Sequence, residues 1–258
     1  MFLIDTHTHL YLDEFKHDID ELIEKAKKKN IQKFLLPNID TKTIQPLLDL
    51  SKLYPKNCYP MIGLHPCSVD QDFLDNLKTL ESKINENNFI AIGEIGIDLH
   101  WDKTYLKEQK KAFETQINWA IKYNLPIVIH SRKSFDEIYQ ILKKYQDQSL
   151  KGVFHCFNGT IEEAQKIIDL GLLLGIGGVL TFKNSNLDQV VEKVSIKHIL
   201  IETDAPYLSP MPYRGKRNQP EFLSIIANKI CEIKNISISE LTNNLYLNTN
   251  SIFFNEKS

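Results

Sequence analysis

Eight short apolar runs that alternate with longer amphipathic stretches constrain the fold of this chain more than any other feature. The runs occupy residues 2–5, 31–39, 58–64, 89–97, 125–130, 152–157, 171–179 and 198–204. They are rich in Ile, Leu, Val and Phe, as are parallel strands that are buried on both faces. Apolar residues recur at helical spacing between them, most clearly at 18–29, 104–124, 134–145 and 160–171. These alternating units predict an α/β fold of the (β/α)8 TIM-barrel type rather than a doubly wound sheet.

The length of the chain, 258 residues, suits one large barrel. Hydrophobic residues make up 42% of it, which is enough for a full core. The sequence contains no internal repeat, no low-complexity segment and no obvious linker. We therefore expect a single domain that spans residues 1–258.

The formal net charge of -2 argues against the broad basic surface of an architectural DNA binder, but it is compatible with a nuclease that has a local site. The N-terminal MFLIDTHTHL lacks the cationic region of a signal peptide. No apolar run approaches the roughly 20 residues of a membrane helix. The four cysteines are scattered without a CxxC pair, so free thiols are expected. We expect a soluble, cytoplasmic protein with no membrane association and no obligate protein partner.

Ionisable residues gather where these apolar runs end. They follow or end six of the eight predicted strands, in the order His7, His9, His65, Glu94, His130, His155 and Asp204. The carboxyl ends of the strands of a TIM barrel meet at one rim, which is the active face of the fold. Residues that are far apart in the sequence should therefore converge there.

The residue types at this rim suit divalent metal ions. His7 and His9 form an HxH pair whose imidazoles can face the same way, although a surface pair would look the same. Glu94 falls between this pair and the later histidines in strand order, where a carboxylate could bridge two cations. Without a cation, these histidines and acids would lie buried together at the rim. Each buried charge without a partner would then cost several kcal/mol. We expect two divalent ions (Mg, Mn or Zn, the identity being open) held by His7, His9, Glu94, His130, His155 and Asp204.

Three residues at or near the rim could have functions other than, or in addition to, binding metal. Asp204 could also accept a proton from the nucleophilic water. His65, in GLHP, has no second ligand beside it, so it could bind a substrate phosphate or make a structural hydrogen bond. Asp5 precedes the HxH pair on the same strand and could accept the free N–H of a ligand histidine. Three other histidines lie outside the rim pattern: His17, His100 and His198.

Basic and polar residues also occur close to the rim. Arg132 follows the fifth run, and the loop 203–220 after the last run carries Arg214, Lys216, Arg217 and Asn218. Loops after the last barrel strands often bind phosphate, and arginine can bind it in a bidentate manner. A solvated basic loop is the alternative. We expect Arg132, Arg214 and Asn218 to bind substrate, and Tyr207 and Tyr213 could stack on bases.

An ordered set of short motifs resembles the TatD-type metal-dependent deoxyribonucleases of the amidohydrolase superfamily. The motifs are DTHTHL (5–10), GLHP (63–66), GEIGID (93–98), IHSR (129–132), HCFNG (155–159) and ETDAPYLSP…YRGKRNQP (202–220). The resemblance implies a TIM barrel, two divalent metals in the same ligand set, and exonuclease action on DNA. It also implies that His65 contacts the scissile phosphate. Asn158, where the family often has Ser, and the segment 99–101 depart from the family pattern.

These observations predict a hydrolase that cleaves phosphodiester bonds of DNA through a two-metal-activated water. Asp204, His65 and Glu94 are the expected catalytic residues, and the substrate is a strand end or a short single-stranded segment. The alternative is an amidase or deacylase acting on a carbonyl, such as an aminoacyl-tRNA ester. Many enzymes of that kind bridge their metals with a modified lysine on the fourth strand. This chain has Glu94 there, which disfavours the alternative. A non-catalytic binding barrel would not need the complete set of metal-binding side chains.

Overall fold

The computed structural model describes residues 1–100 and 102–254. Its strands are β1 (Leu3–Asp5), β2 (Ile31–Leu36), β3 (Cys58–Pro60), β4 (Ile92–Asp98), β5 (Ile127–Arg132), β6 (Gly152–Phe154), β7 (Leu173–Ile176) and β8 (Ile199–Ile201). All paired strands are parallel, in the orders β1-β2-β3 and β4-β5-β6-β7-β8. Six of the eight strands fall within a predicted apolar run and are shorter than it, whereas β4 and β5 extend beyond the ends of their runs, to Asp98 and Arg132. The longest runs continue into loops that lead to the rim.

Backbone hydrogen bonds join the two groups of strands at both seams. After β3, Ile62 N–H donates to the carbonyl of Ala91 at 3.1 Å, and Gly93 N–H donates to the carbonyl of Ile62 at 2.8 Å. After β1, Thr6 N–H donates to the carbonyl of Ile201 in β8 at 3.1 Å. The strands therefore close into a ring, which confirms the predicted TIM barrel.

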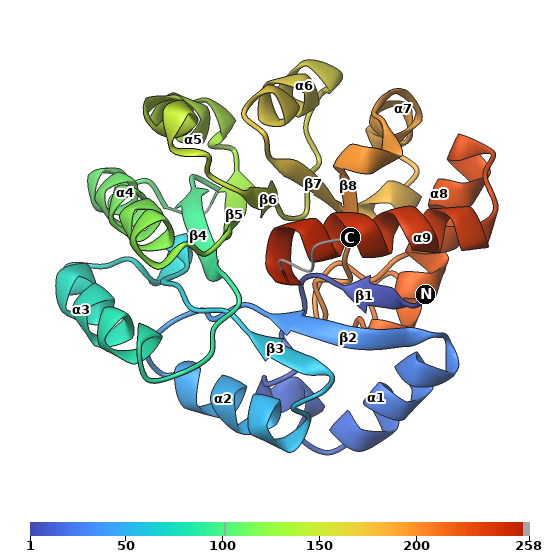
Figure 1. The fold of residues 1–258 in the computed structure, drawn as a ribbon, viewed down its shortest axis with the longest axis horizontal. Helices are drawn as coiled ribbons and strands as arrows, with labels where there is room; N and C mark the ends of the chain where they lie inside the picture. Colours follow the sequence, from blue (N-terminus) through green and yellow to red (C-terminus); the bar gives the residue numbers. More distant parts are fainter. Residues whose placement is uncertain (101, 255–258) are drawn as a thin grey trace.

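Helices surround this ring (Figure 1). They are α1 (Ile19–Lys28), α2 (Ile44–Leu53), α3 (Phe73–Ile84), α4 (Leu106–Tyr123), α5 (Phe135–Leu142), α6 (Ile161–Asp169), α7 (Leu187–Lys193), α8 (Leu223–Lys234) and α9 (Ile238–Thr249). Short 3-10 turns occur at Asp13–Phe15, Pro66–Ser68, Lys143–Gln148, Gly178–Thr181, Ile196–His198 and Pro220–Phe222, and a π-helical turn at Asn250–Phe254. The additional helix α9 packs on β1 and β8 and lies across one end of the ring in Figure 1.

Two apolar clusters hold the barrel together. The larger lies between the strands and the surrounding helices. The smaller takes one residue from each strand segment and is closed by two residues after α9: Ile4, Leu35, Met61, Ala91, Val128, Val153, Leu173, Leu200, Ile252 and Phe253. Side chains two positions apart on a strand face the same side. Two positions further along β5, β6 and β8 the inward residues are His130, His155 and Glu202, so the polar site lies directly on this apolar layer.

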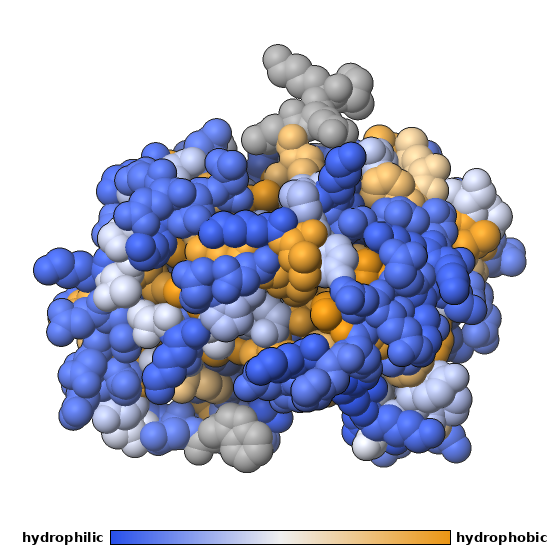
Figure 2. All heavy atoms as spheres, turned by 90° about the horizontal axis from the view of Figure 1, so that it is seen from below, coloured by the Kyte–Doolittle hydropathy of each residue, from blue (hydrophilic) through white to orange (hydrophobic). Residues whose placement is uncertain are grey.

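Hydrophilic side chains cover most of the side of the molecule that Figure 2 shows, with apolar atoms visible between them near the middle. Within 1–100 and 102–254, no helix has the length and apolarity needed to span a bilayer. The four cysteines are all free thiols, as predicted.

Candidate metal centre

The carboxyl ends of the strands surround a cavity of about 660 Å³. Its lining includes six of the seven predicted rim residues: His9, His65, Glu94, His130, His155 and Asp204. The seventh, His7, is fully buried, and its ring stacks on that of His155 with 3.8 Å between the centroids. Residues spread over most of the chain therefore meet at one place.

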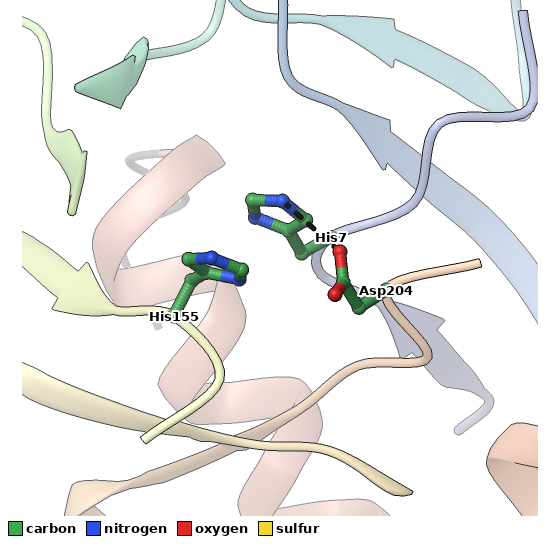
Figure 3. A group of neighbouring side chains, drawn as sticks. All are labelled: His7, His155 and Asp204. Atoms are coloured by element: carbon green, nitrogen blue, oxygen red, sulfur yellow. Dashed lines mark ion pairs between the residues drawn. The ribbon is translucent and has the colours of Figure 1, made fainter. Parts of the chain in front are cut away.

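Figure 3 shows three of these side chains, which follow β1, β6 and β8. The rings of His7 and His155 lie face to face, with 12° between their planes. Asp204 lies beside them, and its Oδ1 is 3.8 Å from His7 Nε2. The ligand atoms of the three residues lie within 4.8 Å of one another, which is close enough to surround one ion.

Glu94, which is 2% exposed, lies at the centre and divides the site into two groups. Its Oε2 faces His7 Nε2 at 3.1 Å and His9 Nε2 at 3.6 Å. Its Oε1 faces His130 Nδ1 at 2.7 Å and His155 Nε2 at 2.8 Å. Each carboxyl oxygen thus has its own pair of imidazole nitrogens, which is the arrangement needed for a carboxylate that bridges two cations.

Asp204 and His65 complete the two groups on different sides of Glu94. Asp204 Oδ1 lies 3.6 Å from His9 Nε2 and therefore belongs to the Oε2 group. His65 Nε2 lies 3.3 Å from Glu94 Oε1 and 3.3 Å from His130 Nδ1, and therefore belongs to the Oε1 group. His65 is thus part of the site, which the sequence left open.

The outward nitrogens of three histidines reveal which ring nitrogen carries a proton. His9 Nδ1 is 3.0 Å from the Tyr11 hydroxyl oxygen, and that hydroxyl donates to the carbonyl of Pro37 at 2.6 Å. The hydroxyl proton is therefore committed to Pro37, so His9 Nδ1–H is the donor to Tyr11. His130 Nε2 lies 3.0 Å from Asp98 Oδ2 and donates to it. In both rings the outward nitrogen is thus the donor to a fixed acceptor, and the inward nitrogen is the one that could bind a cation.

His155 follows the same rule through a different partner. Its Nδ1 is 3.1 Å from Glu202 Oε1, which also accepts the Cys156 N–H at 2.5 Å. Glu202 is fully buried, and a carboxylate can only accept when it is ionised. His155 Nδ1 therefore donates to Glu202, while Nε2 faces Glu94 Oε1 at 2.8 Å and is the nitrogen that could bind a cation in place of its proton.

His65 is held in the opposite tautomer. Its Nδ1 accepts a hydrogen bond from the backbone N–H of Cys67 at 3.0 Å. A backbone N–H can only donate, so Nδ1 is unprotonated and Nε2 carries the hydrogen. His65 therefore keeps a hydrogen on its inward Nε2, whereas the other three histidines have a hydrogen-bond acceptor at the outward nitrogen and can offer the inward nitrogen to a cation. This difference separates a hydrogen-bond donor from the histidines that could bind metal.

Burial and mutual charge set the ionisation of the cluster. Burial opposes ionisation of Glu94, but the neighbouring histidines, His155 first, outweigh it and hold the pKa of Glu94 well below its usual value. Asp204 behaves in the same way: burial raises its pKa, and the neighbouring histidines, His9 first, lower it overall. Both carboxyls are therefore anions at neutral pH. Imidazole lone pairs with carboxylate oxygens are a donor set for Zn, Mn or related divalent ions.

Comparison with known proteins agrees with this geometry. The family model of the "TatD related DNase" matches residues 4–254. The chain belongs to the TatD family. The uncharacterized metal-dependent hydrolase YabD of Bacillus subtilis is 34% identical over 252 residues, which cover 97% of this chain and 98% of YabD. The crystal structure of YjjV, a TatD homolog from Escherichia coli K12, superposes with a TM-score of 0.92 at 28% identity, covering 97% of both chains. A TatD family hydrolase from Entamoeba histolytica gives a TM-score of 0.85 at 26% identity, covering 98% of both chains. The protein is thus a metal-dependent hydrolase of the TatD family, with a group of side chains that could bind metal.

The predicted substrate residues of this TatD-family chain separate into two kinds. Arg132 is exposed and lines the cavity of the metal centre. Asn218, by contrast, is fully buried, and its Nδ2 donates to the carbonyls of Thr203 and Tyr207 at 2.6 Å each. The expectation that Asn218 contacts substrate is wrong, because its amide is used to hold the loop after β8 in place.

Two of the remaining loop residues, Arg214 and Tyr213, are also held by protein contacts. Arg214 lies outside the described lining of the metal cavity, with its guanidinium 4.0 Å from the ring centroid of Phe182. Tyr213 stacks on Phe222 with 4.2 Å between centroids, so this face is not free for a base. Tyr207 is 48% exposed and does line the cavity, which leaves it able to stack.

Asp5 has a different partner from the one predicted. It accepts hydrogen bonds from the Thr203 hydroxyl at 2.5 Å and the Thr203 N–H at 2.8 Å, not from an imidazole. Burial raises the pKa of Asp5 to about 8, although the bonds from Thr203 lower it. Asp5 therefore ties β1 to the segment after β8 and positions His7 only through the backbone.

Three partners of the histidines were missed in the sequence. Asp98, Glu202 and Tyr11 hold His130, His155 and His9 respectively. A signal existed for the first two, because each is an acid at the end of an otherwise apolar run. Tyr11 lies in a loop and had no comparable signal.

Proposed function

We propose that this TatD-family hydrolase cleaves phosphodiester bonds at the end of a DNA strand or in a short single-stranded segment, with two divalent ions in the pockets on either side of Glu94. One observation carries the proposal: His9, His130 and His155 each have a hydrogen-bond acceptor at the outward ring nitrogen, which makes the inward nitrogen available to a cation, whereas a backbone donor at His65 Nδ1 keeps a hydrogen on its inward Nε2. Two ions, when bound, would polarise the phosphate and lower the pKa of a water molecule.

The residues of the chain supply the other functions of the reaction. Asp204 is ionised, reaches the group on the Oε2 side of Glu94, and accepts the proton of the attacking water. His65 Nε2–H donates to a phosphate oxygen and stabilises the charge that develops there. Arg132 at the exposed edge of the cavity binds a second phosphate oxygen. Glu94 holds the two halves of the site at a fixed separation.

The cavity favours a phosphate over a carbonyl substrate. An ester or amide carbonyl develops negative charge on one oxygen, whereas a phosphodiester has two unbridged oxygens. His65 and Arg132 offer two separate donors at one side of the cavity, which suits the second case. Hydrolysis of an aminoacyl ester is therefore the second candidate, to be measured beside DNA.

The experiment compares wild type with Glu94→Gln, which keeps the shape of the side chain and removes its charge. Both proteins are stripped of metal and incubated with end-labelled single-stranded DNA, with Mg, Mn or Zn added in turn. We expect metal-dependent shortening of the strand by wild type and its loss in Glu94→Gln. Metal-loaded wild type that leaves DNA intact but hydrolyses an ester or amide panel would overturn the proposed substrate class.

A further inference from the structure

A second cavity, of about 920 Å³, opens beside the metal centre. The two cavities share the lining residues Ser131, His155, Asn158 and Val179, so they lie side by side. The second one lies between the loops after β5, β6 and β7, on the same rim of the barrel. A substrate chain whose scissile bond lies at Glu94 can therefore extend into it.

The walls of this second cavity combine aromatic rings with carboxamides. Phe135 and Phe182 line it and are both partly exposed; one face of the Phe182 ring contacts the Arg214 guanidinium, and Phe135 stacks beside Tyr139, so each ring can offer only its remaining exposed surface. Four exposed amide side chains also line it: Asn158, Asn184, Asn186 and Gln189. In the part of the chain that the structure describes, these four amide groups have no hydrogen-bond partner. Exposed rings can stack on bases, and free carboxamides can donate to and accept from base edges.

Charge is distributed unevenly along this cavity. Lys133 is the one lysine or arginine among its described lining residues, and it follows Arg132 beside the metal centre; Lys166 and Arg214 lie over the lining rings of Phe135 and Phe182. The part formed by the first turns of α5 and α6 carries four acids: Asp136, Glu137, Glu162 and Glu163. The phosphates of a long strand would be repelled there.

The start of α6 could otherwise attract a phosphate, because helix N-termini bind anions. Here that position is already filled. Thr160 Oγ1 accepts the Glu163 N–H at 3.2 Å, and Glu163 Oε2 accepts the Thr160 N–H at 2.7 Å. This capping box neutralises the N-terminus with a carboxylate of the chain itself. Carboxylates can instead accept a hydrogen bond from a sugar hydroxyl.

We propose that this second cavity binds the terminal nucleosides of the strand whose phosphodiester lies at Glu94, and that its acidic wall selects a strand end with a free hydroxyl over one with a terminal phosphate. The inference rests on the proposed function. It adds to that function the place where the strand end binds and the chemical group that the strand end carries. The rings and amides hold the bases, while the acids limit how many phosphates enter.

The test uses single-stranded dodecamers that carry a hydroxyl or a phosphate at the 3′ end, the 5′ end or both. Bis(p-nitrophenyl) phosphate, which is too short to reach the second cavity, reports on the metal centre alone. With wild type, we expect a phosphate at one of the two ends to lower kcat/KM at least tenfold, and a phosphate at the other end to have less than a twofold effect. The Glu137→Gln/Glu162→Gln variant should reduce this discrimination at least threefold.

A second variant tests the aromatic wall. Phe182→Ala should lower kcat/KM for the dodecamer at least tenfold more than for the small diester, mainly through KM. Tyr59→Ala is the matched control, because its ring packs on Phe254 near the other end of the barrel and should not separate the two substrates. Thermal melting of each variant shows that it is folded.

The outcomes are distinguishable. If wild type cleaves the small diester and the dodecamers but ignores terminal phosphates, or prefers them, the inference about the second cavity is overturned and the nuclease proposal survives. If wild type with metal cleaves neither substrate, the proposed function itself fails, and this inference fails with it.

Discussion

The two ends of the barrel use the same inward-facing positions for opposite purposes. At the end nearest α9, Val128 and Val153 belong to a closed apolar cluster that includes Phe253. Two positions further along the same strands, His130 and His155 face a cluster of ionisable groups. The first end stabilises the fold by excluding water from apolar side chains. The second end buries charged groups, which is energetically unfavourable unless an ion or substrate of complementary charge is bound.

The backbone shows the same contrast. Four residues near the rim have positive φ without being glycine: Lys133 (56°), Cys156 (48°), Asp204 (57°) and Leu208 (52°). Such conformations cost on the order of 1–3 kcal/mol each and persist where the surrounding structure enforces them. The other four lie at loop or helix ends: Asn30, Asn124, Ser149 and Asn235. Unfavourable backbone conformations often occur at functional sites, so the four at the rim agree with the position of the candidate site.

We expect substitutions at the polar end to lower activity and substitutions at the apolar end to lower stability. The largest expected effect is that of replacing Glu94. Glu94→Gln should lower the turnover of metal-loaded enzyme by at least about 10³-fold, as expected for a residue that acts as part of a unit. The metal-free protein should stay folded because no packing is lost, with a moderate fall in melting temperature because the lowered pKa of Glu94 means that its charge stabilises the folded state. Steady-state kinetics and calorimetry check both parts. A large loss of metal-free stability would show that Glu94 supports the fold.

The matching substitution at the apolar end is Phe253→Ala. It removes a buried ring from the smaller cluster and should lower the free energy of unfolding by about 3–5 kcal/mol. The turnover of the folded fraction should change less than tenfold. Denaturant unfolding and kinetics at low temperature measure the two effects. Loss of activity as large as that of Glu94→Gln, without loss of stability, would abolish the distinction between the ends.

Within the rim, His65 and His130 should behave differently because of their tautomers. His65→Gln should retain metal and lose turnover by about 10²–10³-fold, as for removal of a single hydrogen-bond donor to a developing oxyanion. His130→Gln should lose bound metal. Metal analysis by mass spectrometry distinguishes them. Loss of metal in His65→Gln would mean that His65 is a ligand.

A smaller effect is expected from Glu202, which touches no substrate. Glu202→Gln keeps the side-chain shape but weakens the orientation of His155, so metal affinity should fall about 10–100-fold. Titration with a metal indicator gives the affinity directly. Glu192→Gln changes an exposed glutamate on α7 and is the control that should leave it unaltered.

The smallest effect concerns the loop after β8. Asn218→Ala leaves the carbonyls of Thr203 and Tyr207 without their donor, which should cost about 1–3 kcal/mol of stability. Because Asn218 is buried, KM for DNA should change less than threefold. A large rise in KM at unchanged stability would restore Asn218 as a substrate contact.

The sequence was sufficient to predict the barrel and the convergence of the rim residues, because strand ends are placed by a general property of this fold. It was not sufficient for side chains whose role depends on what surrounds them. Asn218 and Asp5 look like site residues in the sequence, but tertiary contacts commit both to the backbone around Thr203. Glu202 looked like part of a strand, and only the fold shows that it meets His155. Such pairings depend on contacts between distant segments, which local pattern does not contain.

The central claim is that Glu94 separates two metal pockets, with Oε2 facing His7 and His9 and Oε1 facing His130 and His155. The most direct test is the number of metal ions per chain, measured by inductively coupled plasma mass spectrometry after reconstitution of wild type and His130→Gln. Two ions per wild-type chain and one in His130→Gln are the predicted result. A single ion in wild type that His130→Gln retains would contradict the claim.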